Sequence, residues 1–271
     1  MTFNEDKFIH MRYGTGIDLP NYHGPIGTSI EMCTEVEDLG VTMCNDYKFE
    51  SHIDQIVKKS RSQIGWMMRV FETREERCLL TLFKSLILPH LEYCCQLWSP
   101  KTIGLIRKIE SVQRNFTFRI RGLQQKNYWQ RLQHLKLYSL ERRRERYMVI
   151  YVWKIIQTIV PNFNDEAINI QTRWNDRRGL TCRIPNINRL ASTRLQTLKE
   201  NSFMINGPKL FNIMPREVRD FDGTLIAFKN KLDMFLMTIP DKPALPHYAQ
   251  SSAGNSLLEQ IAQQRAEQMR N

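Results

Sequence analysis

The side chains in this sequence that could do chemistry are mostly lysines and arginines, because the usual catalytic and metal-binding patterns are absent. Cys94 and Cys95 are adjacent, His90 lies four residues before Cys94, and no second pair follows at ligand spacing, so no zinc site is predicted. The sequence contains no nucleophile elbow, phosphate-binding loop or dinucleotide-binding fingerprint. The nearest thing to a site is therefore a basic surface.

Eight basic residues are the candidates for that surface, because they fill the polar faces of two expected amphipathic helices. Such a row of cations can neutralise the phosphates of a nucleic acid, and Tyr128 and Trp129 could stack on sugars or bases. The alternative is an ordinary solvated face whose arginines pair with nearby carboxylates, with Trp129 in the core. The candidate nucleic-acid-binding residues are Lys58, Lys59, Arg61, Arg107, Lys108, Arg114, Arg119 and Arg121.

The positive charge of the chain is concentrated in one window. The 271 residues carry 39 Lys and Arg against 28 Asp and Glu, a net charge of +11. Residues 101–150 hold 13 basic and 3 acidic residues, whereas residues 1–50 hold 3 basic and 9 acidic residues. A clustered excess of this kind is typical of a surface that binds a polyanion. We therefore expect nucleic-acid contact at the helix over 101–121 and in the segment after it.

The elements that must position these residues are mainly helices. After residue 50, apolar residues recur at spacings of three, four and seven, which predicts amphipathic helices. Pro89 should kink or end the second helix, because proline has no N–H to donate. The expected helices run over 51–71, about 73–89, 101–121, 128–137, 139–159 and 225–237.

The two ends of the chain differ from this helical middle. Residues 1–45 combine Gly and Pro with short apolar clusters, which predicts short strands and turns. Residues 240–254 have the composition of a linker, and residues 257–270 predict an exposed helix that contributes little to the core. The expected fold class is mainly α: a short β segment at the N-terminus, then a helical bundle and further helices.

Composition excludes several classes of protein. A hydrophobic content of 42% can fill a core, so the chain is not a disordered tail. Six cysteines without the spacing of a disulfide framework predict a reduced, intracellular protein, nuclear or cytoplasmic. The longest apolar runs are far shorter than the ~20 residues of a membrane span, so we expect no membrane role.

Seven short motifs along the chain agree in order and spacing with one family. They are Asp38-Leu39-Gly40-Val41, Ser51-His52-Ile53, the stretch from Leu88-Pro89-His90 to Trp98, Val112-Gln113-Arg114, Leu140-Glu141-Arg142-Arg143, Phe211-Asn212-Ile213-Met214-Pro215 and Phe228-Lys229. Over roughly residues 3–240 the sequence resembles the C-terminal part of jockey-like non-LTR retrotransposon reverse transcriptases.

The resemblance implies an RNA-directed DNA polymerase without its catalytic centre. In that family, palm aspartates, two of them in a Tyr-x-Asp-Asp hairpin, hold the Mg²⁺ ions for nucleotidyl transfer. This sequence contains no Asp-Asp pair, so we expect no cofactor in this chain and no polymerisation by it alone.

Two further positions take a role from the resemblance. The run 3–7 resembles the motif just after the catalytic hairpin, whose lysine assists the leaving group. Without the metals that lysine, Lys7, has no transition state to serve, and we expect an exposed strand-end residue. Leu39, Gly40 and Val41 resemble the primer-grip turn.

The resemblance also divides the chain and gives it a function. The expected parts are the end of the palm (1–50), a helical thumb (51–122), a basic helical extension (123–160), a post-thumb region (161–239), and a linker with a tail (240–271). The first hypothesis is a polymerase fragment whose thumb retains binding of an RNA/DNA primer-template duplex or RNA. The alternative is a co-opted or degenerate interaction protein, whose cluster from Arg142 to Arg146 docks on an acidic protein partner.

Overall fold

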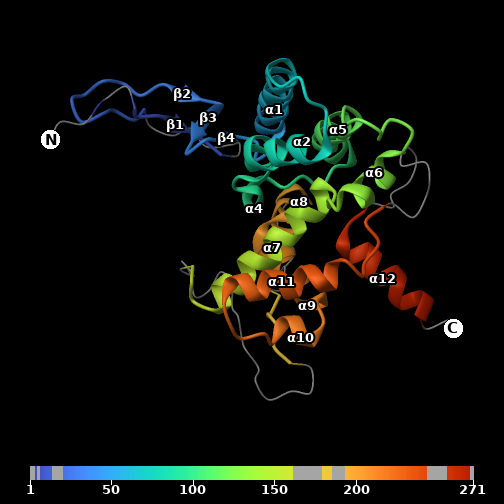
Figure 1. The fold of residues 1–271 in the computed structure, drawn as a ribbon. Coiled ribbons are helices and arrows are strands. Elements are labelled where there is room, and N and C mark those ends of the chain that lie inside the picture. Colours follow the sequence, from blue (N-terminus) through green and yellow to red (C-terminus); the bar gives the residue numbers. More distant parts are fainter. Residues whose placement is uncertain are drawn as a thin grey trace.

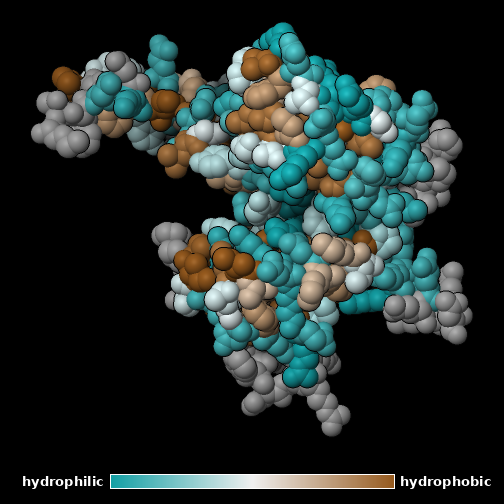
Figure 2. Space-filling model, in the orientation of Figure 1, coloured by the Kyte–Doolittle hydropathy of each residue, from teal (hydrophilic) through white to brown (hydrophobic). Residues whose placement is uncertain are grey.

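The computed structural model describes residues 4, 7–13, 21–160, 179–184, 193–242 and 255–268. It is 60% helix and 6% strand, with the strands near the N-terminus, which confirms the mainly α fold class. Figure 1 shows an N-terminal arm projecting from an upper helical body, with a second helical body below, and the space-filling view in Figure 2 shows the same three parts.

The arm is built from two small sheets. Strand β1 (His10–Met11) pairs in parallel with β2 (Met32–Cys33). Strand β3 (Glu35–Asp38) pairs antiparallel with β4 (Val41–Cys44) and forms a hairpin. Isolated two-stranded sheets are marginally stable in water, so the arm depends on its attachment to the helices.

The hairpin turn has an unusual residue at its tip. Asp38 pairs with Val41, which leaves Leu39 and Gly40 as a two-residue turn with φ values of 46° and 80°. Positive φ at both positions matches a type I′ turn, in which Asn-Gly is the favoured pair. A leucine in this left-handed region costs about 1–2 kcal/mol. The hydroxyl of Tyr93 donates a hydrogen bond to the carbonyl of Leu39 at 3.0 Å and so supports the strained turn.

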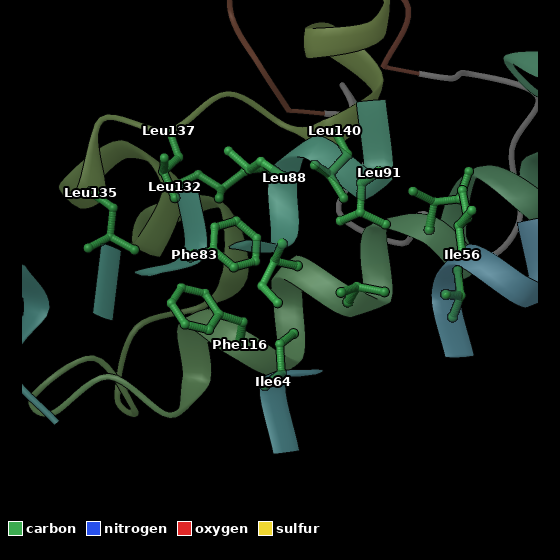
Figure 3. Packing of buried hydrophobic residues seen from close by; sticks show 14 of the residues in the cluster. Ile56, Ile64, Phe83, Leu88, Leu91, Phe116, Leu132, Leu135, Leu137 and Leu140 are labelled. Carbon is green, nitrogen blue, oxygen red and sulfur yellow. The ribbon is translucent and has the colours of Figure 1, made fainter. Parts of the chain in front are cut away.

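The upper body has a single apolar core. Figure 3 shows this core, where Phe83 stacks on Phe116 with ring centroids 4.2 Å apart. Its elements are α1 (Glu50–Val70), α2 (Glu76–Leu82), the π-helical segment η2 (Phe83–Ile87), α3 (Leu88–Glu92), α4 (Cys95–Trp98), α5 (Ile103–Phe118) and α6 (Tyr128–Leu135).

Pro89 does not end the second predicted helix. The π-helical segment η2 precedes it, and the chain stays helical as α3 through Glu92. Pro89 lies in the first turn of α3, where its missing N–H leaves no hydrogen bond of that helix unmade. The sequence pattern indicated a kink or an end here; the helix does not end, and its type changes just before the proline.

The lower body has its own core around α7. Trp153 stacks on Phe228 with centroids 4.4 Å apart, and Phe211 is fully buried. Helix α7 joins the two bodies, because Leu140 lies in the upper core and the helix from Met148 onward lies in the lower one. The lower elements are α7 (Leu140–Ile156), α8 (Thr193–Asn201), α9 (Phe203–Ile213), α10 (Arg216–Arg219), α11 (Leu225–Leu236) and α12 (Leu257–Gln268).

The C-terminal helix is part of the lower core. The sequence predicted a helix here and α12 is one, but the expectation that it contributes little to the core is wrong. Leu257 and Ile261 are buried, and the Leu257 N–H donates to the Glu145 carboxylate at 2.8 Å. Just before the helix, Asn255 donates to Asp241 at 2.6 Å. Most of the predicted linker, 243–254, lies outside the described residues.

Candidate nucleic-acid interface

The structure brings part of the predicted basic set together where α1 lies against α5. Arg61 on α1 donates to the hydroxyl of Ser111 on α5 at 2.8 Å. Lys108 on α5 forms an ion pair with Asp54, seven residues before Arg61 on α1. Lys58 lies one helical turn after Asp54 and is exposed on the same side of α1. Three of the eight predicted residues therefore share one surface.

The exposed side of α1 carries more than the sequence analysis assigned to it. Arg69 continues the row of cations toward the end of the helix, and Trp66 is 50% exposed beside it. We call Lys58, Arg61, Trp66 and Arg69 the α1 stripe. The signal for Trp66 was available in the sequence, because its position falls outside the buried face that runs from Ile53 to Met67.

Lys59 lies at the edge of α1 next to α3. There the side chain of Gln63 contacts the His90 ring with their nitrogens 3.0 Å apart. Burial, with a smaller effect of the nearby Lys59 charge, lowers the pKa of His90. Lys59 is exposed and lies seven residues before Trp66, so it shares the Trp66 side of the α1 stripe.

The remaining candidates spread along α5 and beyond it. Arg107 is half-buried one turn before Ser111, and the Arg114 guanidinium lies over the Tyr128 ring, 4.8 Å from its centroid. Arg119 and Arg121 are exposed beyond the end of α5. In the described parts of the chain no hydrogen bond or ion pair joins Arg114, Arg119 or Arg121 to the α1 stripe, whereas Ser111 is joined to it through Arg61.

The aromatic residues proposed to stack on bases are not both available. Tyr128 is 5% exposed and donates its hydroxyl hydrogen bond to Glu110, so the expectation that it stacks on a nucleic acid is wrong. Trp129 is partly buried and packs against the upper core. Both rings belong to the packing of α6 on α5.

The arginine cluster at the start of α7 is internal. Arg142 is fully buried and Arg144 is 1% exposed. Arg143 forms an ion pair with Glu92, and Arg146 binds both oxygens of Asp233 at 2.5 and 2.6 Å. The expectation that this cluster docks on an acidic partner is wrong, because the joining position of α7 covers these side chains with both bodies.

Buried carboxylates accompany these arginines. Glu110 accepts hydrogen bonds from the Leu140 N–H at 3.0 Å and from the Tyr128 hydroxyl, and burial raises its pKa to about 7. Burial also raises the pKa of Glu145, which accepts from the Leu257 N–H, to about 8. The start of α7 is therefore a polar, largely dry junction between the two bodies.

The positions that the resemblance assigned to a palm differ in their exposure to solvent. Lys7 is exposed in a short turn of the arm. In the predicted primer grip, Leu39 is 84% exposed and Gly40 is exposed, but Val41 is 3% exposed and packs in the upper core. Only the tip of the turn can therefore meet a ligand.

Metal ligands and membrane spans were sought in the described ranges. No group of three or more His, Cys, Asp or Glu side chains there is placed to hold a metal ion. In the same ranges no helix has both the length and the apolar character needed to cross a bilayer.

Comparisons with known proteins add no family to these observations. No family model, no curated protein and no solved structure matches the chain.

Proposed function

We propose that this chain binds an RNA/DNA duplex or RNA through the α1 stripe, as the thumb of a non-LTR reverse transcriptase fragment. The sequence motifs support the family. One structural observation supports the binding: the three cations of the stripe are exposed in a row on one helix, and in the described parts of the chain none of them forms an ion pair.

The stripe suits a phosphate backbone better than a specific base sequence. Lysine and arginine side chains spaced along a helix meet successive phosphates, and such contacts position a protein without reading bases. The opposite side of α1 is fixed in the upper core by Ile53, Ile64 and Met67, so the cations are held on a rigid support. Trp66 adds an aromatic face that can pack on a sugar or an unpaired base.

The same proposal assigns no polymerase activity to this chain alone. The family enzyme transfers nucleotides with metal-bound palm aspartates, and the motifs that carry them are absent from this sequence. Nucleotide incorporation by the purified protein on a primed template, with no other polymerase added, would contradict this part.

The binding is tested by fluorescence anisotropy with a 20-base-pair RNA/DNA hybrid over a range of salt. A triple alanine variant removes the stripe cations, and a second triple variant removes three exposed cations of the lower body as a matched control. The stripe variant is Lys58→Ala, Arg61→Ala and Arg69→Ala, and the control is Arg183→Ala, Lys199→Ala and Lys242→Ala.

The two variants should separate clearly. Each lost phosphate contact lowers the slope of log affinity against log salt by about 0.7–0.9, so the stripe variant should lose about 2–3 from that slope. We expect on the order of a hundredfold weaker binding at 0.1 M salt for the stripe variant and less than a threefold change for the control. Equal losses in both variants, or no salt dependence in the wild type, would refute the proposal.

A further inference from the structure

The tip of the β3–β4 hairpin combines a strained backbone with an exposed apolar side chain. Leu39 has a positive φ and is 84% exposed, so neither its conformation nor its burial stabilises the fold. Such outliers persist where function requires them and the surroundings hold them in place. Here the support is the Tyr93 hydroxyl, which donates to the Leu39 carbonyl at 3.0 Å.

The surface around Leu39 is apolar with an acidic border. Tyr93, whose hydroxyl reaches the Leu39 carbonyl, is 52% exposed. On the hairpin, Glu37 and Asp38 are exposed, and in the described residues neither forms an ion pair. We call Glu37, Asp38, Leu39 and Tyr93 the hairpin patch.

The hairpin patch is not suited to a nucleic acid or to a copy of itself. Two exposed carboxylates beside the apolar tip repel phosphates, and two such patches facing each other repel in the same way. A complementary surface must offer apolar area together with cations. On this chain the α1 stripe has those properties, because Trp66 lies among Lys58, Arg61 and Arg69.

The two surfaces cannot meet within one chain. Strand β4 is fixed to the first turns of α1, because Thr42 donates two hydrogen bonds there: its N–H donates to the His52 ring at 3.2 Å, and its hydroxyl donates to Gln55 at 2.8 Å. Trp66 lies 11 residues beyond Gln55, about 16 Å further along the helix at 1.5 Å per residue. The tip can therefore reach a stripe only on another molecule.

We propose that the hairpin patch of one molecule docks on the α1 stripe of a second copy of this chain. The contact joins two different surfaces, so each molecule keeps one patch and one stripe free for further copies. Few side chains take part, which places the contact among weak, transient interfaces, and its charges make it sensitive to salt.

Self-association would also regulate nucleic-acid binding, and this consequence rests on the proposed function of the stripe. A duplex on the stripe and a hairpin patch on the stripe exclude each other. Duplex should therefore dissociate the self-associated protein, and the hairpin patch should act as a competitor that lowers duplex affinity at high protein concentration.

The docking is tested by sedimentation velocity of the full chain at 5–100 µM protein, in 20 and 300 mM NaCl. We expect the weight-average sedimentation coefficient of the wild type to rise with concentration at 20 mM and to stay constant at 300 mM. Leu39→Asn should abolish the rise, because asparagine accepts the left-handed turn but removes the apolar tip. Ile226→Asn is the matched control, since Ile226 is 73% exposed on the lower body, and it should associate like the wild type.

A charge exchange gives the second arm of the test. The acidic side is reversed by Glu37→Lys with Asp38→Lys, and the basic side by Lys58→Glu with Arg69→Glu. Each reversed protein alone should remain a monomer, because its patch and its stripe then have the same charge. An equimolar mixture should associate again, because the reversed patch then meets the reversed stripe and the unchanged patch of one protein meets the unchanged stripe of the other.

Three results would overturn the docking. They are a wild type that stays monomeric in 20 mM NaCl, association that survives Leu39→Asn, and a mixture of reversed proteins that does not associate. A hybrid-binding measurement distinguishes this proposal from the previous one. The two proposals fail separately: a wild type that binds the hybrid but stays monomeric would overturn the docking alone, and a wild type that associates but does not bind the hybrid would overturn the proposed function alone.

Discussion

The α1 stripe and the start of α7 contain the same kinds of residue with opposite surroundings. On α1, the cations at 58, 61 and 69 are exposed. On α7, Arg142 and Arg144 are buried, and Arg143 and Arg146 are paired with carboxylates. The difference shows that a cluster of positive charge in sequence is accessible to a ligand only where the fold leaves it uncovered.

The positions of the two helices explain this difference. Helix α1 has one side in the upper core and the other in solvent, whereas α7 joins the two bodies and is covered from several sides. The carboxylates that compensate its arginines come from far along the chain: Glu92 is 51 residues from its partner and Asp233 is 87. Charge counted in a 50-residue window cannot include them.

The largest expected effect tests the buried side of the comparison. Arg146→Ala leaves Asp233 without its partner, and because the two side chains are 15% and 26% exposed, the change should cost about 2–3 kcal/mol of unfolding free energy, less than breaking a fully buried pair. Urea denaturation measures the loss. Arg69→Ala, on the exposed side of α1, is the control and should change the free energy by no more than about 0.5 kcal/mol. Similar losses in both variants would remove the distinction between the two regions.

A second, smaller effect is the pH dependence of the α7 junction. The pKa of Glu145 is raised to about 8, first by burial and then by Glu141, from an ordinary value of about 4.3. The folded state therefore keeps a proton that the unfolded state releases. The stability that this proton contributes is complete below about pH 4.3 and is lost as the pH rises through about 8.

Glu145→Gln tests this pH dependence because the amide oxygen can still accept from the Leu257 N–H. We expect the variant to lose less stability than the wild type between pH 6 and 9, with a difference in slope of up to about 1.4 kcal/mol per pH unit. Thermal unfolding across that range measures it. Glu110, with a pKa of about 7, loses its proton over the same range in both proteins and therefore does not change the difference between them. If stability plotted against pH runs parallel for the variant and the wild type up to pH 9, the pH dependence does not come from Glu145.

Local patterns predicted the helices well and the ends of the chain less well. The periodicity of apolar residues predicted 51–71 and 101–121, and the structure has Glu50–Val70 and Ile103–Phe118. The π-helical segment before Pro89 has no sequence signal of this kind, since it adjusts a helix to its packing. The burial of Leu257 depends on contacts with residues more than 100 positions away, which no local pattern contains.

The candidate site was predicted only in part, for a related reason. The sequence indicated which residues lie on the polar side of α1, so Lys58 and Arg61 were found. It could not show that Tyr128 is buried against Glu110, because that contact joins residues 18 positions apart. It also could not show that Val41 is in the core while Leu39 is exposed, because a two-residue turn has no periodic pattern of apolar residues. The predicted domain boundaries remain predictions, as does the family.

The smallest expected effect on stability is at the Asp54–Lys108 ion pair, which is exposed like the α1 stripe but paired like the arginines of α7. Both side chains are about half exposed, so the pair contributes about 0.5 kcal/mol or less, and Asp54→Asn should leave stability almost unchanged. The change nonetheless removes a negative charge next to Lys58 and frees Lys108 for a phosphate. If the stripe binds nucleic acid, affinity for the hybrid should rise about two- to threefold at 0.1 M salt, and the salt slope should become steeper by up to about 0.9. A fall in affinity would instead mean that Asp54 helps to hold the surface in its binding geometry. Pairing with a carboxylate would then not be what separates the buried cations of α7 from the exposed cations of α1.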